Sequence, residues 1–365
     1  MKKILFIDDS ALMRSIFCDI INSDHRFVVE DTAADGQEGL KLLKEKSYDL
    51  ILLDLMMPNM DGITFLKKIN QMQCTSKVVI FSMVAGDGTQ ITIEALSLGA
   101  ADFITKPQTV EEIQSDIFKK QFFRIISSVV FDDESDFVHS NEDKIHSFHR
   151  HNRKDISGIK GHDKINARSA GKIVAIASST GGPKALMEVM SRLPADLDAP
   201  VLVVQHMPAG FTESLAKRLD SVSALQIQEA SDGIALEKGH VYIAKGGLHM
   251  EIKHKYHDDR ICLFDGCTRE GVKPCANYMF ESLAHSKFQE VVCVVLTGMG
   301  ADGTEGIKRL KCSKQVHVIT QSKETCSVYG MPRAVDMAKL TDESVPLDKV
   351  AEAIIKNVGV MKDGC

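Results

Sequence analysis

The stretch that decides the fold of the second half of this chain is Ile173-Val174-Ala175-Ile176-Ala177-Ser178-Ser179-Thr180-Gly181-Gly182. Its apolar run is typical of a buried parallel strand, and the small polar residues after it are typical of a turn into a helix. Residues 201–206 and 291–302 have the same form, an apolar run that stops at a reactive side chain. Because parallel strands bring their carboxyl ends to one edge of a sheet, we expect Ser179, His206 and Asp302 to meet there.

Length and charge restrict the classes of protein that need to be considered. The chain has 365 residues, 44% hydrophobic content and a formal net charge of -6, which favours two globular domains and disfavours nucleic-acid binding. No apolar run approaches the roughly 18 residues of a membrane span. The apolar run at the start ends at Asp8 and Asp9 and reads as a buried strand, not a signal peptide. We therefore expect a cytoplasmic protein without membrane insertion.

The nine cysteines are an odd number and show no paired Cys-x-x-Cys spacing. A disulfide framework or a structural zinc site is therefore disfavoured. Cys293 lies inside an apolar run, and the others are scattered. We expect reduced and mostly packed thiols.

Residues 1–125 alternate strand and helix patterns with short links. The expected strands are 3–7, 27–30, 50–53, 77–81 and 102–104, and the expected helices are 11–21, 36–46, 63–72, 89–98 and one from residue 110 onward. Five such units predict an α/β domain with a doubly wound, five-stranded parallel sheet of the flavodoxin-like kind.

Residues 126–170 are predicted to form a linker, and residues 171–357 a second α/β domain. The linker is polar and contains five histidines without regular spacing, which are expected to be solvated: His139, His146, His149, His151 and His162. The second domain should have a mainly parallel sheet. Turn signals at Asp232-Gly233 and Gly246-Gly247 predict an antiparallel, hairpin-like portion in its middle.

Acidic residues end two neighbouring strands of the first domain. Asp8 and Asp9 follow the first strand, and Asp54 follows the third. Three carboxylates in one pocket repel one another unless a hard cation such as Mg²⁺ neutralises them. Ser82 ends the fourth strand, and Lys106 follows the fifth. They would add a hydroxyl and an ammonium suited to holding phosphoryl oxygens.

This arrangement resembles the receiver domain of two-component response regulators. The resemblance implies that Asp54 accepts a phosphoryl group from a phosphohistidine on a sensor histidine kinase. It also implies a Mg²⁺ site formed by Asp8, Asp9, Asp54 and the Met56 carbonyl. The residues of the switch would be Ser82, Phe103 and Lys106. An aspartyl phosphatase would carry a second acid at Met56, which disfavours that alternative.

The three reactive residues of the second domain match the roles of triad catalysis. Ser179 would be the nucleophile, His206 its general base and acid, and Asp302 the group that orients the imidazole, with the serine hydroxyl at hydrogen-bonding distance from the ring. The glycines around Met299 make its N–H a candidate oxyanion donor. An ordinary α/β hydrolase is disfavoured, because the Gly-x-Ser-x-Gly elbow is absent and the order is Ser, His, Asp.

Four motifs of the second domain are similar to the catalytic domain of chemotaxis protein-glutamate methylesterases, the CheB family. They are Ser179-Thr180-Gly181-Gly182-Pro183, Gln205-His206-Met207-Pro208, Leu296-Thr297-Gly298-Met299-Gly300-Ala301-Asp302-Gly303 and Tyr329-Gly330-Met331-Pro332-Arg333. The resemblance implies hydrolysis of glutamate γ-methyl esters on the cytoplasmic helices of chemoreceptors, with methanol release, deamidation of selected glutamines and no cofactor for the esterase step. The family usually has Arg-Pro-Ser-x-Asp at a rim segment where this chain has Lys273-Pro274-Cys275-Ala276-Asn277.

Two other kinds of output remain open from the sequence. The second domain could be a binding module that docks on signalling proteins without catalysis, or a nucleotide-binding domain that uses the glycine-rich loop around Met299, although no Gly-Lys-Ser/Thr loop accompanies it. Methanol release would separate the enzyme from both. We also expect the unphosphorylated receiver to pack over the edge that carries Ser179, and phosphorylation to loosen that contact.

Overall fold

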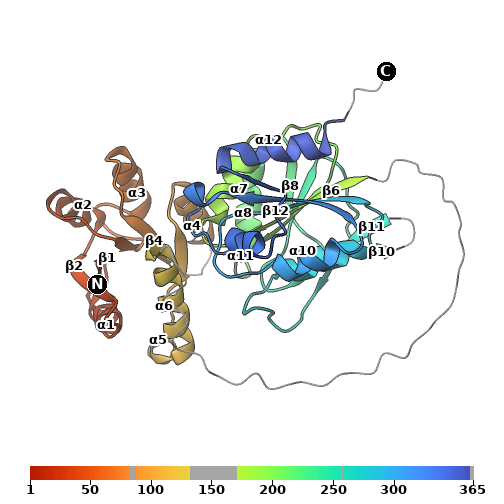
Figure 1. Ribbon diagram of the computed structural model, residues 1–365. Helices are drawn as coiled ribbons and strands as arrows, with labels where there is room; N and C mark the ends of the chain where they lie inside the picture. The colour runs from red at the N-terminus through yellow and green to blue at the C-terminus, as the bar shows by residue number, and fades with distance from the viewer. Residues whose placement is uncertain (83–87, 132–170, 256–257, 362–365) are drawn as a thin grey trace, which may run out of the picture.

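The computed structural model describes residues 1–82, 88–131, 171–255 and 258–361. Figure 1 shows two α/β bodies side by side, the first coloured red to yellow and the second green to blue. The predicted linker and its five histidines lie outside the described residues, except for residues 126–131. All eight cysteines in the described part of the chain are free thiols, as expected.

The first domain has the predicted parallel sheet, with strand order β2-β1-β3-β4-β5. Its strands are β1 (Lys2–Ile7), β2 (Phe27–Ala33), β3 (Leu50–Leu53), β4 (Lys77–Ser82) and β5 (Asp102–Thr105). The sheet is covered by α1 (Ala11–Asn22), α2 (Gly36–Glu45), α3 (Gly62–Gln71), α4 (Gly88–Ser97), α5 (Val110–Gln114) and α6 (Asp116–Val130). Ser10, Asp35 and Asp61 cap the first three helices by accepting hydrogen bonds from backbone amides, which explains where these helices begin.

The predicted helix from residue 110 onward is two helices, because the chain is extended at Ser115 (φ -64°, ψ 138°). The Ser115 hydroxyl accepts a hydrogen bond from the Phe118 amide and thereby starts α6. This second helix continues to Val130, past the predicted boundary at residue 125. Its last turns reach the second domain, as described below.

The second domain contains a seven-stranded parallel sheet with strand order β14-β13-β12-β6-β7-β9-β8. The strands are β6 (Lys172–Ser178), β7 (Val201–Gln205), β8 (Gln226–Glu229), β9 (His240–Ile243), β12 (Glu290–Val295), β13 (Gln315–Gln321) and β14 (Glu343–Val345). The antiparallel portion is a separate hairpin of β10 (His249–Lys255) and β11 (Asp258–Phe264). The turn at Asp232-Gly233 does not form a hairpin, because β8 and β9 pair in parallel.

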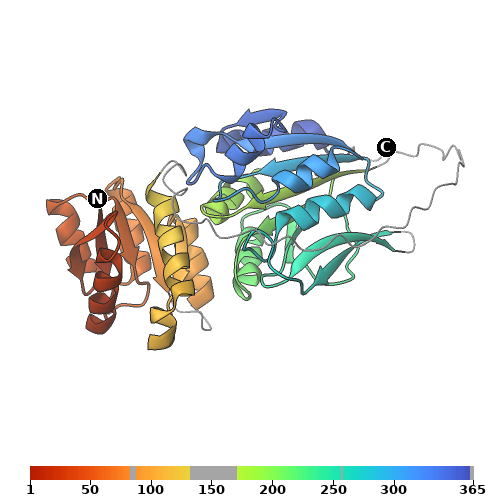
Figure 2. The same ribbon diagram turned by 60° about the horizontal axis from the view of Figure 1, so that its bottom comes forward.

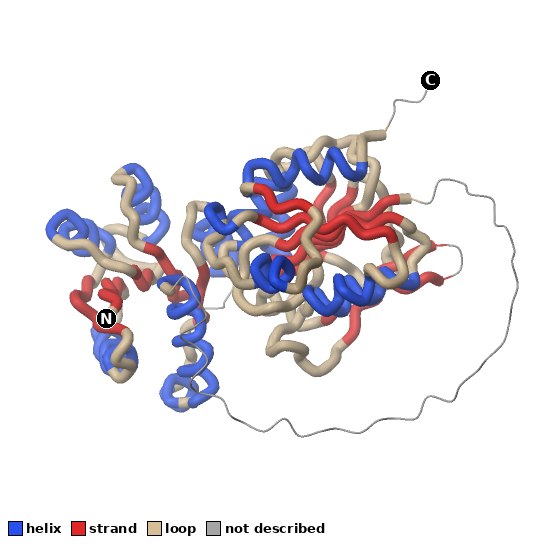
Figure 3. The backbone as a smooth tube through the Cα atoms, viewed as in Figure 1, coloured by secondary structure: helices blue, strands red, loops and turns tan. Residues whose placement is uncertain are grey.

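Helices cover both faces of this sheet, as Figure 3 shows for the strands in red and the helices in blue. One face carries α7 (Gly182–Met190), α8 (Phe211–Asp220) and α12 (Leu347–Val358), and the other carries α9 (Ala276–Ser282), α10 (Thr304–Leu310) and α11 (Met331–Met337). Apolar positions alternate along each strand between the two cores, as expected for a sheet buried on both faces. The sequence patterns had not indicated α11 or β14.

The strand order reverses direction at β6, which lies between β12 and β7. Ala177 pairs with Val295, and Ser178 pairs with Gln205, so these three strands end at nearly the same level. The segments that follow them therefore emerge together at the carboxyl edge of the sheet. Such a switch point is where open α/β sheets bind their ligands.

Candidate active site and phosphoacceptor site

The two adjacent serines at the end of β6 have different surroundings. Ser178 is fully buried, and its hydroxyl donates to the Gln205 side-chain oxygen at 2.7 Å. Ser179 is partly exposed and lines a cavity of about 840 Å³. Of these two serines, only Ser179 therefore presents its hydroxyl to the space in which a substrate would lie.

Gln205 holds the turns after β6 and β7 together. Its side-chain nitrogen donates to the backbone oxygen of Ser179 at 2.9 Å and to that of His206 at 3.3 Å. It is almost fully buried, so these bonds do not compete with water. The sequence placed Gln205 beside His206 but gave no sign that its side chain spans the two turns.

His206 and Asp302 form a close pair. The His206 Nε2 lies 2.8 Å from Asp302 Oδ2, and both side chains are nearly buried, with 9% and 3% exposed. This pairing leaves Nδ1 as the ring nitrogen available to a serine. Across the described residues, no hydrogen bond joins the Ser179 hydroxyl to His206, although both line the same cavity. The expected nucleophile–base bond is thus not formed in this arrangement; such bonds often tighten only around a bound substrate.

Residues at the start of α9 donate hydrogen bonds to the Asp302 carboxylate. The Cys275 thiol donates to Oδ1 at 3.0 Å, and the backbone amides of Ala276 and Asn277 donate at 2.6 and 3.0 Å. Burial alone would raise the pKa of Asp302, but the bonds from His206, Cys275 and Ala276 outweigh it and hold the pKa below its usual value. The segment expected at a substrate rim therefore packs against Asp302.

Asn277 connects this support to the edge of the cavity. Its side-chain nitrogen donates to Glu270 Oε1 at 2.6 Å, and its side-chain oxygen accepts from the Gly306 amide at 2.6 Å. Burial, followed by the charge of Asp302, raises the pKa of Glu270, which also lines the cavity. Sequence reasoning had not singled out Glu270.

The glycine-rich loop after β12 brings Met299 to the cavity. A Cβ at Gly298 would lie 2.7 Å from Ser179 Cβ, so only glycine permits this approach. The Gly298 oxygen accepts hydrogen bonds from the Gly330 and Met331 amides at 3.0 and 2.8 Å, which ties the loop to the start of α11. Among the described residues, the Met299 amide has no protein acceptor, as an oxyanion donor requires.

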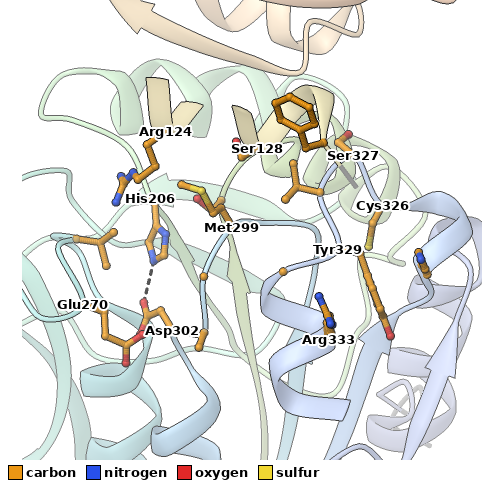
Figure 4. Close-up of a pocket in the computed structure, with 18 of the residues that line it drawn as sticks. Arg124, Ser128, His206, Glu270, Met299, Asp302, Cys326, Ser327, Tyr329 and Arg333 are labelled. Atoms are coloured by element: carbon orange, nitrogen blue, oxygen red, sulfur yellow. Dashed lines mark hydrogen bonds and ion pairs between the residues drawn. The ribbon is translucent and has the colours of Figure 1, made fainter. Parts of the chain in front are cut away.

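The cavity is lined by both domains. Figure 4 shows Arg124 and Ser128 of α6 lying above His206 and Met299, with Asp302 below the imidazole and Tyr329 and Arg333 to one side. Phe131, which follows α6, also lines the space. The catalytic edge of the second domain thus faces the end of the first domain.

Direct contacts join the two domains beside this cavity. The Asp102 carboxylate accepts from the Thr180 hydroxyl at 2.5 Å, and the Ala101 oxygen accepts from the Gly181 amide at 2.9 Å. Burial raises the pKa of Asp102. Figure 2, in which the view is turned, likewise shows the first domain against one end of the second. The turn that follows Ser179 therefore contacts the first domain.

The acidic cluster of the first domain also forms as the sequence indicated. One carboxylate oxygen from each of Asp8, Asp9 and Asp54 lies within 4.8 Å of the others. The Lys106 ammonium lies 2.8 Å from Asp8 Oδ2 and 2.6 Å from Asp54 Oδ2. Burial raises the pKa of Asp54, and the charge of Lys106 offsets this only in part. Clustered carboxylates of this kind fit Mg²⁺.

The other receiver residues surround this cluster or face the second domain. Ser82 is buried at the end of β4, and its hydroxyl accepts from Thr92 at 3.3 Å. Met56 is exposed, and its amide donates to Asp54 Oδ1 at 3.3 Å. Phe103 is buried and stacks on Phe211 at the start of α8, with ring centroids 4.5 Å apart. An expected switch residue therefore lies in the contact between domains.

Comparisons with known proteins find a family for each of the two domains. The CheB methylesterase family matches residues 174–354, and the response regulator receiver domain family matches residues 4–118. A protein-glutamate methylesterase/protein-glutamine glutaminase 1 of Syntrophomonas wolfei is 38% identical over 97% of this chain and 98% of its own length. The corresponding protein of Geobacillus kaustophilus is 38% identical over 98% and 99%.

A solved structure supports the same assignment for the second domain. The crystal structure of the Thermotoga maritima CheB methylesterase catalytic domain is 41% identical, with a TM-score of 0.50, and covers 51% of this chain and 98% of that one. Within the described residues, no helix is long and apolar enough to cross a bilayer.

Proposed function

This chain belongs to the CheB family of receiver-containing protein-glutamate methylesterases/protein-glutamine glutaminases, and we propose that Ser179, His206 and Asp302 carry out its hydrolysis. The observation that carries this proposal is the His206–Asp302 pair at 2.8 Å beside the partly exposed Ser179 in one cavity. The substrates are glutamate γ-methyl esters on chemoreceptor helices, and the reaction releases methanol.

The residues divide the reaction into two acyl transfers. The Ser179 oxygen attacks the ester carbonyl carbon while His206 Nδ1 takes its proton, and the oxyanion is stabilised by the Met299 amide. The bond to the methoxy oxygen then breaks, and the proton on His206 leaves with it as methanol. Water, activated by His206, cleaves the acyl-serine to give the glutamate carboxylate and restores the Ser179 hydroxyl.

Asp302 keeps its negative charge throughout this cycle. Its pKa lies below the usual value because of the hydrogen bonds from His206 and α9, so it stabilises the imidazolium without accepting the proton. The same steps with ammonia as the leaving group convert a glutamine amide into glutamate. No cofactor enters either reaction.

The first domain regulates this site through Asp54. A sensor histidine kinase supplies the phosphoryl group, and Asp8, Asp9, Asp54 and the Met56 carbonyl would hold Mg²⁺, which neutralises charge on the phosphoryl oxygens. The negative charge of the phosphoryl group attracts the Ser82 hydroxyl and the Lys106 ammonium. This rearrangement shifts Phe103. Because Phe103 stacks on Phe211, such a shift would weaken the contact between the domains.

We place the boundaries of the receiver, linker and esterase at the predicted residues, 1–125, 126–170 and 171–357, with α6 crossing the first boundary. We also place the protein in the cytoplasm. Its phosphodonor and the receptor helices on which it acts are both expected there.

The proposal is tested by methanol release from membranes that carry methylated chemoreceptors. The Ser179→Ala variant should lose on the order of 10⁴-fold in rate, because it lacks the nucleophile. Ser178→Ala is the matched control, since that hydroxyl bonds to Gln205 inside the fold, and it should retain most activity. An active Ser179→Ala enzyme would contradict the assignment. So would a pair of results in which Ser178→Ala is inactive and Ser179→Ala is active.

A further inference from the structure

The loop before α9 places one further acid in the wall of the cavity. Glu270 lines the cavity together with Ser179 and His206, and Figure 4 shows it in the same part of the wall as Asp302. The two acyl transfers from ester to serine and from serine to water do not use it. Its carboxylate is therefore available for another role in the same cavity.

The backbone at Glu270 has a conformation that a glutamate rarely adopts. Its φ is 54°, and that of Gly271 is 74°, which are the two positive values of a type I′ turn. The Arg269 and Val272 amides close the turn by donating to each other's backbone oxygens, at 3.3 and 3.1 Å. Such turns favour glycine, asparagine and aspartate, so a longer carboxylate here is unusual. Strained residues of this kind cluster at functional sites.

Asn277 fixes the direction of the Glu270 side chain. Its side-chain nitrogen donates to Glu270 Oε1 at 2.6 Å, while its backbone amide donates to Asp302 Oδ1 at 3.0 Å. Asn277 is itself fully buried. One residue thus holds both carboxylates, and Glu270 lies close enough to the catalytic pair for the charge of Asp302 to raise its pKa and that of His206 to lower it.

The second oxygen of this carboxylate, Oε2, remains available to a ligand. In the part of the chain that the structure describes, no donor bonds to Oε2 and no cation pairs with Glu270. The neighbouring Arg269 is engaged elsewhere, since its guanidinium donates to both carboxylate oxygens of Glu281 at 2.8 and 2.9 Å. An ionised carboxylate accepts hydrogen bonds and donates none. A substrate group beside Oε2 is therefore favoured when it carries an N–H.

The two leaving groups of this enzyme family differ in exactly this property. A carboxamide nitrogen carries two N–H donors, whereas the methoxy oxygen of an ester carries none. We propose that Glu270 is a specificity-determining residue, which accepts a hydrogen bond from the leaving nitrogen of a glutamine side chain and thereby favours deamidation over ester hydrolysis. The inference rests on the proposed function and adds a residue to it.

The bonds that form and break in deamidation are those of the proposed mechanism. Ser179 attacks the amide carbonyl carbon while His206 takes its proton. The C–N bond then breaks as the proton passes from His206 to the nitrogen, which leaves as ammonia. Oε2 of Glu270 holds one N–H of that nitrogen in the tetrahedral intermediate. Glu270 itself forms no covalent bond and transfers no proton.

The experiment uses the full chain and two sets of receptor membranes, one with glutamine and one with glutamate γ-methyl ester at the modified positions. Ammonia release from the first and methanol release from the second are measured, and their ratio is the readout. Glu270→Gln keeps an acceptor for Asn277 but turns an amide NH₂ toward the cavity. We expect the ratio to fall about tenfold, the usual effect of losing one hydrogen bond to a charged group.

A second variant separates specificity from folding. Glu270→Asn suits a positive φ, so its melting temperature should be at least that of the wild type, yet it lacks the carboxylate and its ratio should also fall about tenfold. Glu324→Gln is the matched control. Glu324 also lines the cavity but lies on the short 3₁₀ helix Lys323–Thr325, and its substitution should leave the ratio within about twofold of the wild type.

An unchanged ratio in both Glu270 variants, including an equal fall of the two rates, would overturn the proposal. A carboxylate that only supports the fold or the imidazolium affects both reactions alike. The same fall in Glu324→Gln would also overturn it, because the net charge of the cavity would then be responsible. Ser179→Ala identifies failure of the proposed function, since methanol release that survives it counts against the nucleophile. Loss of release in Ser179→Ala with an unchanged ratio at position 270 counts only against Glu270.

Discussion

Asp54 and Asp302 are both buried carboxylates at the carboxyl edge of a parallel sheet, yet their pKa values shift in opposite directions. Burial would raise the pKa of Asp302, but donors from His206 and from the start of α9 more than compensate. Burial raises the pKa of Asp54, and Lys106 offsets this only in part. The negative charge of Asp302 is therefore stabilised by its neighbours, whereas that of Asp54 is compensated only in part.

This difference matches the proposed roles of the two carboxylates. A group that orients a base must remain ionised and immobile, and four hydrogen-bond donors around Asp302 secure both properties. A phosphoacceptor must instead be stabilised by a bound cation and by phosphorylation. Asp54 has the carboxylate of Asp8 beside it, so added positive charge stabilises this cluster. Position in the fold is thus shared, and the neighbours decide the chemistry.

The largest expected effect comes from neutralising the fixed charge. Asp302→Asn should lower methanol release from receptors on the order of 10³- to 10⁴-fold, because an amide neither stabilises the imidazolium nor suits the donors around it. The rate constant at saturating receptor is the measurement. Asp342→Asn, which alters an ion pair with Lys311 elsewhere in the domain, is the control. An Asp302→Asn rate as high as one tenth of the wild-type rate would contradict the role assigned to this carboxylate.

A smaller effect should follow from removing one donor to the same carboxylate. Cys275→Ala should lower the rate about tenfold, because a hydrogen bond to a charged group contributes about 1.5 kcal/mol. Cys275→Ser keeps a donor and should restore the rate to within about threefold. Cys293→Ala, a buried thiol on β12, controls for lost packing. Equal losses in the alanine and serine variants at position 275 would mean that volume, not hydrogen bonding, matters there.

The smallest effect concerns stability and has opposite signs at the two sites. Asp54→Asn should raise the melting temperature of the receiver by about a few degrees at neutral pH, because it removes a carboxylate whose pKa is raised by burial. The folded-state pKa of Asp54 is raised, so stability is lost as pH rises through that value. The gain in Asp54→Asn should therefore disappear in acid.

Asp302 provides the contrasting half of this measurement. Its folded-state pKa is lowered, so its contribution is present above the unfolded value and is lost as pH falls through the folded one. Asp302→Asn should thus lower the melting temperature at neutral pH. Thermal unfolding of both variants at neutral pH and in mild acid checks the signs. A stabilised Asp302→Asn protein would show that the two environments differ less than their contacts indicate.

Much of the architecture could be predicted, because it depends on local patterns. Apolar runs such as the one that ends at Ser178 specify buried strands, and the parallel arrangement follows from their alternation with helices. The break at Ser115 was missed, since a serine inside an amphipathic pattern is compatible with a continuous helix until its hydroxyl caps the next one. The turn expected at Asp232-Gly233 does not close a hairpin, because turn residues mark a reversal without specifying which strands pair.

Which residues can react, and that they follow parallel strands, could be inferred from the chain alone, since residue type and apolar periodicity are local properties. Three other features appear only in the folded protein: Gln205 joins two turns, Cys275 donates to Asp302, and α6 lines the cavity. Each of these contacts joins residues distant in the chain, and their geometry depends on how whole helices pack. Packing of that kind leaves no periodic signal in the sequence, because any residue of suitable size and hydrogen-bonding capacity can satisfy it.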